Sequence, residues 1–195
     1  MKTKITSFLL LLCINTIAQS SQKRDWVDTR SVYSDSLGNV VVHNSLPKGG
    51  GGYLDFNNQK YSYVIFWTQL TNESNKSLDV TIKFPANPFP IFQSQNSYLR
   101  IFTPPDTMTL DKIQLGDYGL TNLQSLLNAG FNKPSVIQKT ISSFENYLFY
   151  VMVFLHEARG SARSSLIIKG QDLFYKVRIG NDSTMISCGK IAYKN

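Results

Sequence analysis

Two segments of the chain are apolar at nearly every position, whereas most of the others alternate between apolar and polar residues. Residues 61–70 and 147–155 carry large apolar side chains on both faces of an extended chain. Burial on both faces is typical of strands in the middle of a covered sheet, because a surface strand leaves one face in water. The pattern therefore predicts two central strands.

The remaining apolar patterns predict strands with one buried face. Residues 78–84 alternate strictly between apolar and polar side chains, which places one face in a core and the other in water. Further strands are expected as a hairpin over 32–42, as short strands over 98–102 and 136–141, and as a meander over 166–169, 173–179 and 185–193. About nine strands predict an all-β fold, an antiparallel β-sandwich that is immunoglobulin-like or jelly-roll-like.

Glycine and turn-forming residues mark the connections. Lys48 is followed by four glycines at 49–52, which pack no side chains, so we expect a flexible connection there. Residues 72–76 are expected to form a turn between two strands.

Leucines at helical spacing predict a single short helix. They stand at positions 120, 123, 126 and 127, with Thr121 or Asn122 as a cap and Gly130 as a stop. The helix is an addition to a fold that is otherwise made of strands.

The first 18 residues have the pattern of a signal peptide. Lys2 and Lys4 precede a largely apolar run over 5–14, and Thr16 and Ala18 are the small residues of a cleavage site. The apolar run is shorter than the ~20 residues that span a bilayer. We expect a signal peptide over 1–18, a lead-in, hairpin and glycine-rich connection over 19–52, and the β-sandwich domain over 53–195. A lipid on Cys13 is disfavoured by the large Leu12 before it.

Composition supports a folded chain, and charge adds a basic C-terminal region. The chain has 195 residues, of which 42% are hydrophobic and 17% are charged, values typical of a folded domain. Removing Lys2 and Lys4 lowers the formal net charge from +7 to +5. The last forty residues hold seven basic and three acidic side chains, which could face an anionic glycan or lipid headgroups. Ordinary solvent-facing side chains on antiparallel strands are the simpler interpretation, and no motif indicates nucleic-acid binding.

Aromatic side chains are the candidate ligand-binding residues. Tyr61, Tyr63 and Trp67 share one face of a predicted strand, and aromatic rings can stack on sugar rings. The apolar pattern on both faces of that strand favours a core role for the same three rings. Trp26 lies in the polar lead-in and is the fourth candidate.

The inventory of reactive side chains argues against a catalytic centre. His43 and His156 are the only histidines, and Cys188 is the one cysteine that remains after cleavage. No zinc-site spacing and no Gly-x-Ser-x-Gly motif occurs. We expect no catalytic residue, no metal site and no cofactor. Cys188 should be a buried core residue on a late strand, and His156 should emerge into solvent at the end of a strand.

The alternative function is a small glycan-active enzyme that uses two carboxylates on a jelly roll. Glu145 and Glu157 bracket the second central strand and would stand about 40 Å apart if it is extended, at ~3.4 Å per residue. Glycoside hydrolysis needs two carboxyl groups that lie ~5–10 Å apart. Glu73, in the expected turn, is the remaining partner for either of them.

Several segments resemble those of a group of exported proteins. The lysine-rich start, the ending Ile17-Ala18-Gln19, the segment Thr71-Asn72-Glu73-Ser74 between two strands and the late meander are similar to small exported β-sandwich proteins of Bacteroidota-type bacteria. The predicted signal peptide implies an exported protein that is periplasmic, outer-surface or secreted, and the resemblance supplies no functional residues.

We therefore expect a non-catalytic binding or assembly protein of the cell envelope or extracellular space. An envelope protein or an anionic glycan is the expected partner, with no nucleic acid and no transmembrane span.

Export predicts cleavage after Ala18. The intact mass of the protein from its native host should match a chain that begins at Gln19 and carries no lipid. A mature N-terminus upstream of Ala18, or a lipid on Cys13, would contradict this expectation.

Overall fold

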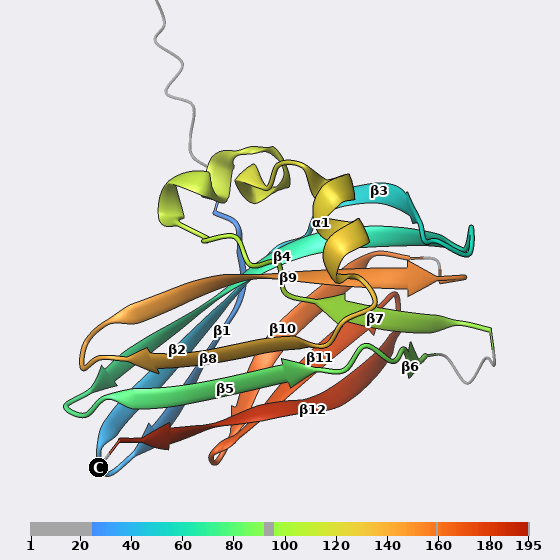
Figure 1. Cartoon of the computed structure of the whole chain (residues 1–195). Helices are drawn as coiled ribbons and strands as arrows, with labels where there is room; N and C mark the ends of the chain where they lie inside the picture. Colours follow the sequence, from blue (N-terminus) through green and yellow to red (C-terminus); the bar gives the residue numbers. More distant parts are fainter. Residues whose placement is uncertain (1–24, 92–95, 159, 195) are drawn as a thin grey trace, which may run out of the picture.

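Two antiparallel sheets pack face to face, and a short helical segment covers the outer side of one of them (Figure 1). The computed structural model describes residues 25–91, 96–158 and 160–194, so the expected signal peptide lies outside the described residues. The predicted all-β antiparallel sandwich is confirmed.

The seven-stranded sheet, sheet A, contains the two central strands. β4 (Lys60–Ser74) pairs with β9 (Asn146–His156) along most of their length. The order of the sheet is β1 (Val27–Asp35), β2 (Gly38–Ser45), β4, β9, β7 (Tyr98–Phe102) and β6 (Phe89–Pro90), and β3 (Lys48–Leu54) pairs with the first part of β4. The segments that are apolar on both faces therefore lie in the middle of sheet A, as predicted.

The five-stranded sheet, sheet B, joins the C-terminal meander to two earlier strands. Its order is β10 (Ala162–Lys169), β11 (Asp172–Ile179), β12 (Asp182–Tyr193), β5 (Leu78–Phe84) and β8 (Ser135–Ile141). Burial alternates along β5 and along most of β11, so each presents one face to sheet A and one face outward. The strict alternation over 78–84 predicted this arrangement.

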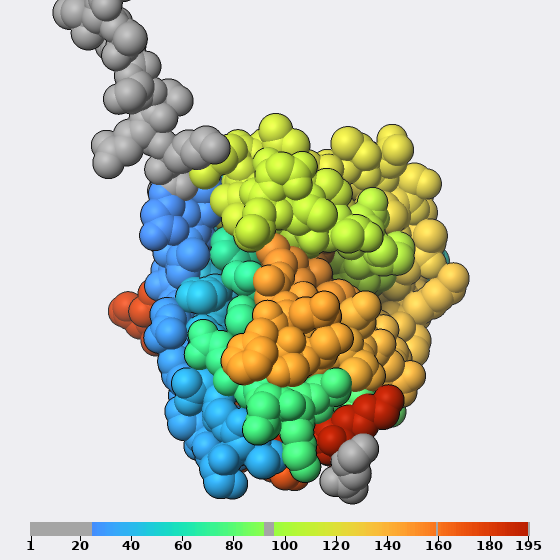
Figure 2. All heavy atoms as spheres, turned by 90° about the vertical axis from the view of Figure 1, so that its left-hand side faces the viewer, coloured from blue at the N-terminus to red at the C-terminus, as the bar shows by residue number. Residues whose placement is uncertain are grey.

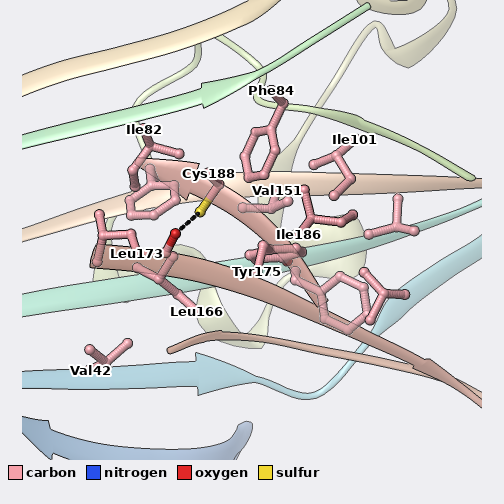
Figure 3. Close-up of a cluster of buried hydrophobic side chains, with 14 of the residues drawn as sticks. Val42, Ile82, Phe84, Ile101, Val151, Leu166, Leu173, Tyr175, Ile186 and Cys188 are labelled. Atoms are coloured by element: carbon pink, nitrogen blue, oxygen red, sulfur yellow. Dashed lines mark hydrogen bonds between the residues drawn. The ribbon is translucent and has the colours of Figure 1, made fainter. Parts of the chain in front are cut away.

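The first of two hydrophobic cores fills the space between the sheets. Val151 from sheet A meets Tyr175 and Ile186 from sheet B in this core (Figure 3). Cys188 lies among them with 3% of its surface exposed, and its thiol donates to the Leu173 carbonyl at 3.4 Å. Burial raises the pKa of the Cys188 thiol to about 12. Cys188 is therefore a buried core residue, as expected.

The second core lies on the other side of sheet A, beneath the chain between β7 and β8. This covering segment (residues 103–134) holds the 3-10 helices η1 (Leu110–Gln114) and η2 (Gly116–Gly119) and helix α1 (Leu123–Gly130). The core consists of Tyr53, Tyr61, Ile65, Trp67, Phe102, Met108, Tyr118, Leu120, Leu127, Phe131, Tyr150, Met152 and Phe154. The predicted helix is present, but it begins at Leu123, and Asn122 makes no capping hydrogen bond with its side chain.

A buried asparagine joins the two sheets at one edge. Asn44 on β2 accepts from the Leu166 amide at 2.8 Å and donates to the Leu166 carbonyl at 3.2 Å. It also donates to the Thr29 hydroxyl and accepts from the Thr68 hydroxyl, both at 3.1 Å. Asn44 therefore satisfies backbone groups on edge strand β10 that would otherwise be buried without partners.

A second buried asparagine joins two connections at one end of the sandwich. The side-chain amide nitrogen of Asn72 lies 2.7, 3.1 and 3.0 Å from the carbonyl oxygens of Lys76, Ile141 and Ser142. Figure 2 views this end, where the β4–β5 turn (green) and the β8–β9 connection (orange) lie side by side.

The turn expected over 72–76 is partly wrong, because β4 continues to Ser74.

The four glycines form a strand, which corrects the expected flexible connection. β3 pairs with β4 and carries a bulge between Gly49 and Gly52. A Cβ on Gly51 would lie 2.7 Å from the Tyr63 hydroxyl, so the bare backbone lets the Tyr63 ring lie against β3. Residues 27–54 therefore belong to sheet A, and the sandwich begins before the expected boundary at residue 53.

Phe154 should be a major source of stability because it is fully buried in the second core. Its ring centroid lies 5.0 Å from that of Phe131 and 6.1 Å from that of Tyr53. Phe154→Ala should lower the free energy of unfolding by about 3–5 kcal/mol, measured by urea denaturation. The matched control Phe56→Ala, at a residue that is 76% exposed, should change it by less than ~0.5 kcal/mol. A loss below ~1 kcal/mol for Phe154→Ala would contradict this packing.

Candidate functional site

The four aromatic candidates lie in the second core or at its margin. Tyr61 and Trp67 are 3% and 2% exposed, and Tyr63 and Trp26 are half-buried against the same core. Burial and the hydrogen bond to the Tyr98 hydroxyl, 3.1 Å away, raise the pKa of Tyr61. Tyr61 and Trp67 therefore offer no open ring face on which a sugar could stack.

Trp26 anchors the covering segment to sheet A. Its ring meets that of Tyr118 edge-to-face at 5.9 Å, and its Nε1 donates to Gln114 at 3.2 Å. The Lys48 ammonium lies 4.0 Å from the centroid of the Trp26 ring and donates to the Leu115 carbonyl at 2.6 Å. These contacts give Trp26 a structural role.

His156 is mostly buried, which corrects the expectation that it emerges into solvent. Its side chain is 15% exposed, and its Nδ1 lies 2.8 Å from the Lys60 carbonyl oxygen. Because a carbonyl only accepts, Nδ1 carries the hydrogen, and Nε2 accepts from the Gln59 amide at 3.2 Å. The Tyr98 ring packs 4.7 Å away, so both nitrogens and one ring face of His156 already have partners.

The glutamates of the enzyme alternative do not come together. Glu145 and Glu157 stand at opposite ends of β9, which runs unbroken from Asn146 to His156. Glu73 lies near the end of β4 and accepts from the Asn39 amide at 3.4 Å. In the ranges that the structure describes, no three His, Cys, Asp or Glu side chains are grouped to hold a metal ion.

No helix among the described residues is both long and apolar enough to cross a membrane.

A hollow of about 500 Å³ opens beside the covering segment. Phe102, Leu126 and Phe149 contribute to its lining, which is mainly apolar, and its charged side chains are Asp106 and Lys133. Small-molecule sites usually have about 300–1,000 Å³ together with a few converging polar groups. The hollow has the volume of such a site and offers apolar surface more than specific chemistry.

The outer face of sheet B gathers basic side chains from four strands. Residues that alternate with the buried ones point away from sheet A, whereas the covering segment lies on the opposite side of sheet A (Figure 1). The cations on this outer face are Lys83, Arg163, Lys169, Lys176, Arg178 and Lys190. Its carboxylates are Asp79, which accepts from the Thr140 hydroxyl at 2.5 Å, and Asp172, and Asp28 of β1 reaches one corner of the face beside Arg163. Positive charge therefore predominates on the outer face.

Hydroxyl groups and a few apolar side chains lie between these cations. Ser165, Ser183 and Ser187 occupy outward positions on β10 and β12. The Lys169 ammonium lies 5.5 Å from the centroid of the Phe174 ring and 3.7 Å from the Met185 sulfur. The outer face thus presents cations and hydroxyl groups, with charge beside its apolar groups.

The sequence indicated an excess of basic residues among the last forty, but it did not indicate that they share one face of a sheet with other cations. The alternation of residues along the strands could have placed part of this face, because Arg163, Lys176 and Arg178 each stand between residues that face the core. Lys83 could not be added from sequence, because β5 lies beside β12 only in the folded sheet.

Comparison with known proteins gives no match: no family model, no curated protein and no solved structure is similar enough to this chain to count as a relative.

Proposed function

We propose that this chain is an exported, non-catalytic binding protein whose outer face of sheet B binds an anionic glycan of the cell envelope or extracellular space. The observation that carries the proposal is the set of six cations on that face, against two carboxylates of sheet B and the Asp28 carboxylate at its corner. A surface of one predominant charge attracts a polymer of the opposite charge and speeds their encounter.

The sheet holds these charges in a fixed array. Neighbouring strands lie ~4.8 Å apart, so cations on adjacent strands are held close together before any ligand arrives. Like charges on neighbouring strands cost stability, and a bound polyanion would remove that cost. The outer face is therefore organised in advance for a ligand with repeated negative charges.

The mixture of groups favours a glycan over a lipid surface. Serine hydroxyls between the cations can exchange hydrogen bonds with sugar hydroxyls. Membrane surface binding usually needs a continuous apolar surface, whereas the two exposed apolar side chains of this face each have a cation beside them: Val136 is paired with Lys83, and the Met185 sulfur lies 3.7 Å from the Lys169 ammonium.

The enzyme alternative has less support. Glu145 and Glu157 lie at opposite ends of an unbroken strand, and Glu73 makes a hydrogen bond with Asn39. Binding by charge and hydroxyl groups needs no pair of carboxylates at catalytic distance.

Neutralising exposed cations of the outer face should weaken glycan binding. The triple variant Lys83→Gln, Lys169→Gln and Lys190→Gln removes three exposed cations of this face. Its dissociation constant for a polyuronate, measured by isothermal titration calorimetry with the mature chain, should rise about tenfold at low salt, since each exposed charge contributes up to ~1 kcal/mol. Binding by the wild-type chain should also weaken between about 0.05 M and about 0.5 M NaCl, because salt screens exposed charges.

The matched control is a second triple variant with the same net charge as the first. Its three substitutions lie away from the outer face. Arg30→Gln, Lys60→Gln and Lys76→Gln remove three exposed cations from β1, β4 and the β4–β5 turn. This variant should bind within about twofold of the wild-type chain. Equal loss in both triple variants, or no binding by the wild-type chain to any acidic polysaccharide, would contradict the proposal.

A further inference from the structure

One corner of the outer face is hollowed between sheet B and the edge of sheet A. A hollow of about 220 Å³ is lined by Asp28 of β1, by Arg163 and Ser165 of β10, and by Lys176 and Arg178 of β11. We infer that this hollow is an oxyanion subsite that binds one carboxylate or sulfate group of the glycan. The inference rests on the proposed function and assigns it a specific point of contact.

The hollow places like charges directly opposite each other. Arg163 and Arg178 are paired across β10 and β11, so their side chains leave the sheet side by side on one face. Lys176 stands two residues before Arg178 and opposite Ser165. Like charges at opposed positions destabilise a sheet, which makes this arrangement costly for an isolated domain.

The charges in the hollow are only partly compensated. The Arg163 Nε lies 3.7 Å from an Asp28 carboxylate oxygen, and its Nη1 donates to the Ala162 carbonyl at 3.2 Å. Within the described ranges, Lys176 and Arg178 form no hydrogen bond or ion pair through their charged groups. Asp28 thus holds one guanidinium in place, while two cations remain available to a ligand.

The chemistry of these groups suits a small oxyanion. A guanidinium offers paired N–H donors in a plane, a geometry that matches the oxygens of a carboxylate or a phosphate, and a sulfate presents oxygens in the same tetrahedral arrangement as a phosphate. The hollow is smaller than the ~300 Å³ at which sites for whole small molecules usually begin. It would therefore admit the charged group of a sugar, while the rest of the polymer lies across the outer face.

The test compares two single variants of the outer face with the same change in charge. Arg178→Gln removes an available cation of the hollow, and Lys190→Gln removes an exposed cation elsewhere on the face. Lys190 is paired with Asp172, six residues from Arg178 along β11, or about 20 Å at ~3.4 Å per residue. Each variant and the wild-type mature chain is titrated calorimetrically with a polyuronate, with a sulfated polysaccharide and with anionic phospholipid vesicles.

The inference predicts a loss of about tenfold in affinity for Arg178→Gln and of about twofold for Lys190→Gln, because charge-assisted bonds in a built site are stronger than screened surface attraction. The melting temperature of Arg178→Gln should equal or exceed that of the wild-type chain, since the variant relieves repulsion from Arg163. If Arg178→Gln lowers the affinity for both polysaccharides, the hollow recognises either oxyanion. If the affinity falls for the polyuronate alone or for the sulfated polysaccharide alone, the group bound in the hollow is a carboxylate or a sulfate, respectively.

Other outcomes would overturn specific parts of the account. Equal losses for the two variants would refute the subsite and leave the proposed function standing. Failure of the wild-type chain to bind either polysaccharide would refute the proposed function and the subsite together. Binding to vesicles but to neither polysaccharide would show that the outer face recognises a lipid surface instead.

Discussion

β4 and β9 are apolar on both faces, so the sheet that contains them must be covered twice. Sheet B covers one face and forms the first core, and residues 103–134 cover the other face and form the second. Sheet B and residues 103–134 each need only one apolar face, which packs on sheet A, because the opposite face is in contact with water. The outer face of sheet B is therefore free to carry charge, and the position of the proposed binding face follows from two strands in the other sheet.

Buried polar groups fix how the two sheets meet. Asn44 uses its side-chain amide to satisfy the backbone of Leu166 on an edge strand, and Asn72 ties together two connections that cross between the sheets. These hydrogen bonds form in a water-poor interior, where an unpaired amide costs about 1–3 kcal/mol. The joint at Asn44 also brings β1 alongside β10, which is why Asp28 can reach Arg163 and shape the corner of the binding face.

The sequence was informative where a local pattern determines structure and silent where distant residues meet. Apolar residues on both faces identified β4 and β9, and alternation identified β5, because strand periodicity is local. The pattern does not predict the strand over Gly49–Gly52, because that strand depends on a contact with another strand. The Tyr63 ring of β4 packs against the backbone of the glycines, where a side chain would not fit. His156 was misplaced for a related reason: Gln59, Lys60 and Tyr98, which surround it, come from other strands and turns. The binding face could be anticipated only in part, because the place of β5 beside β12 is set by the sheet order.

The location of the ligand tests the central claim most directly. Backbone amide chemical shifts of the mature, isotope-labelled chain can be followed by NMR during titration with a short acidic oligosaccharide. The account predicts that the largest changes fall on β10, β11, β12 and β5, with a maximum around Arg163 and Arg178. Changes confined to the apolar hollow around Phe102, Leu126 and Phe149 would contradict it, and so would a spectrum that the oligosaccharide leaves unchanged.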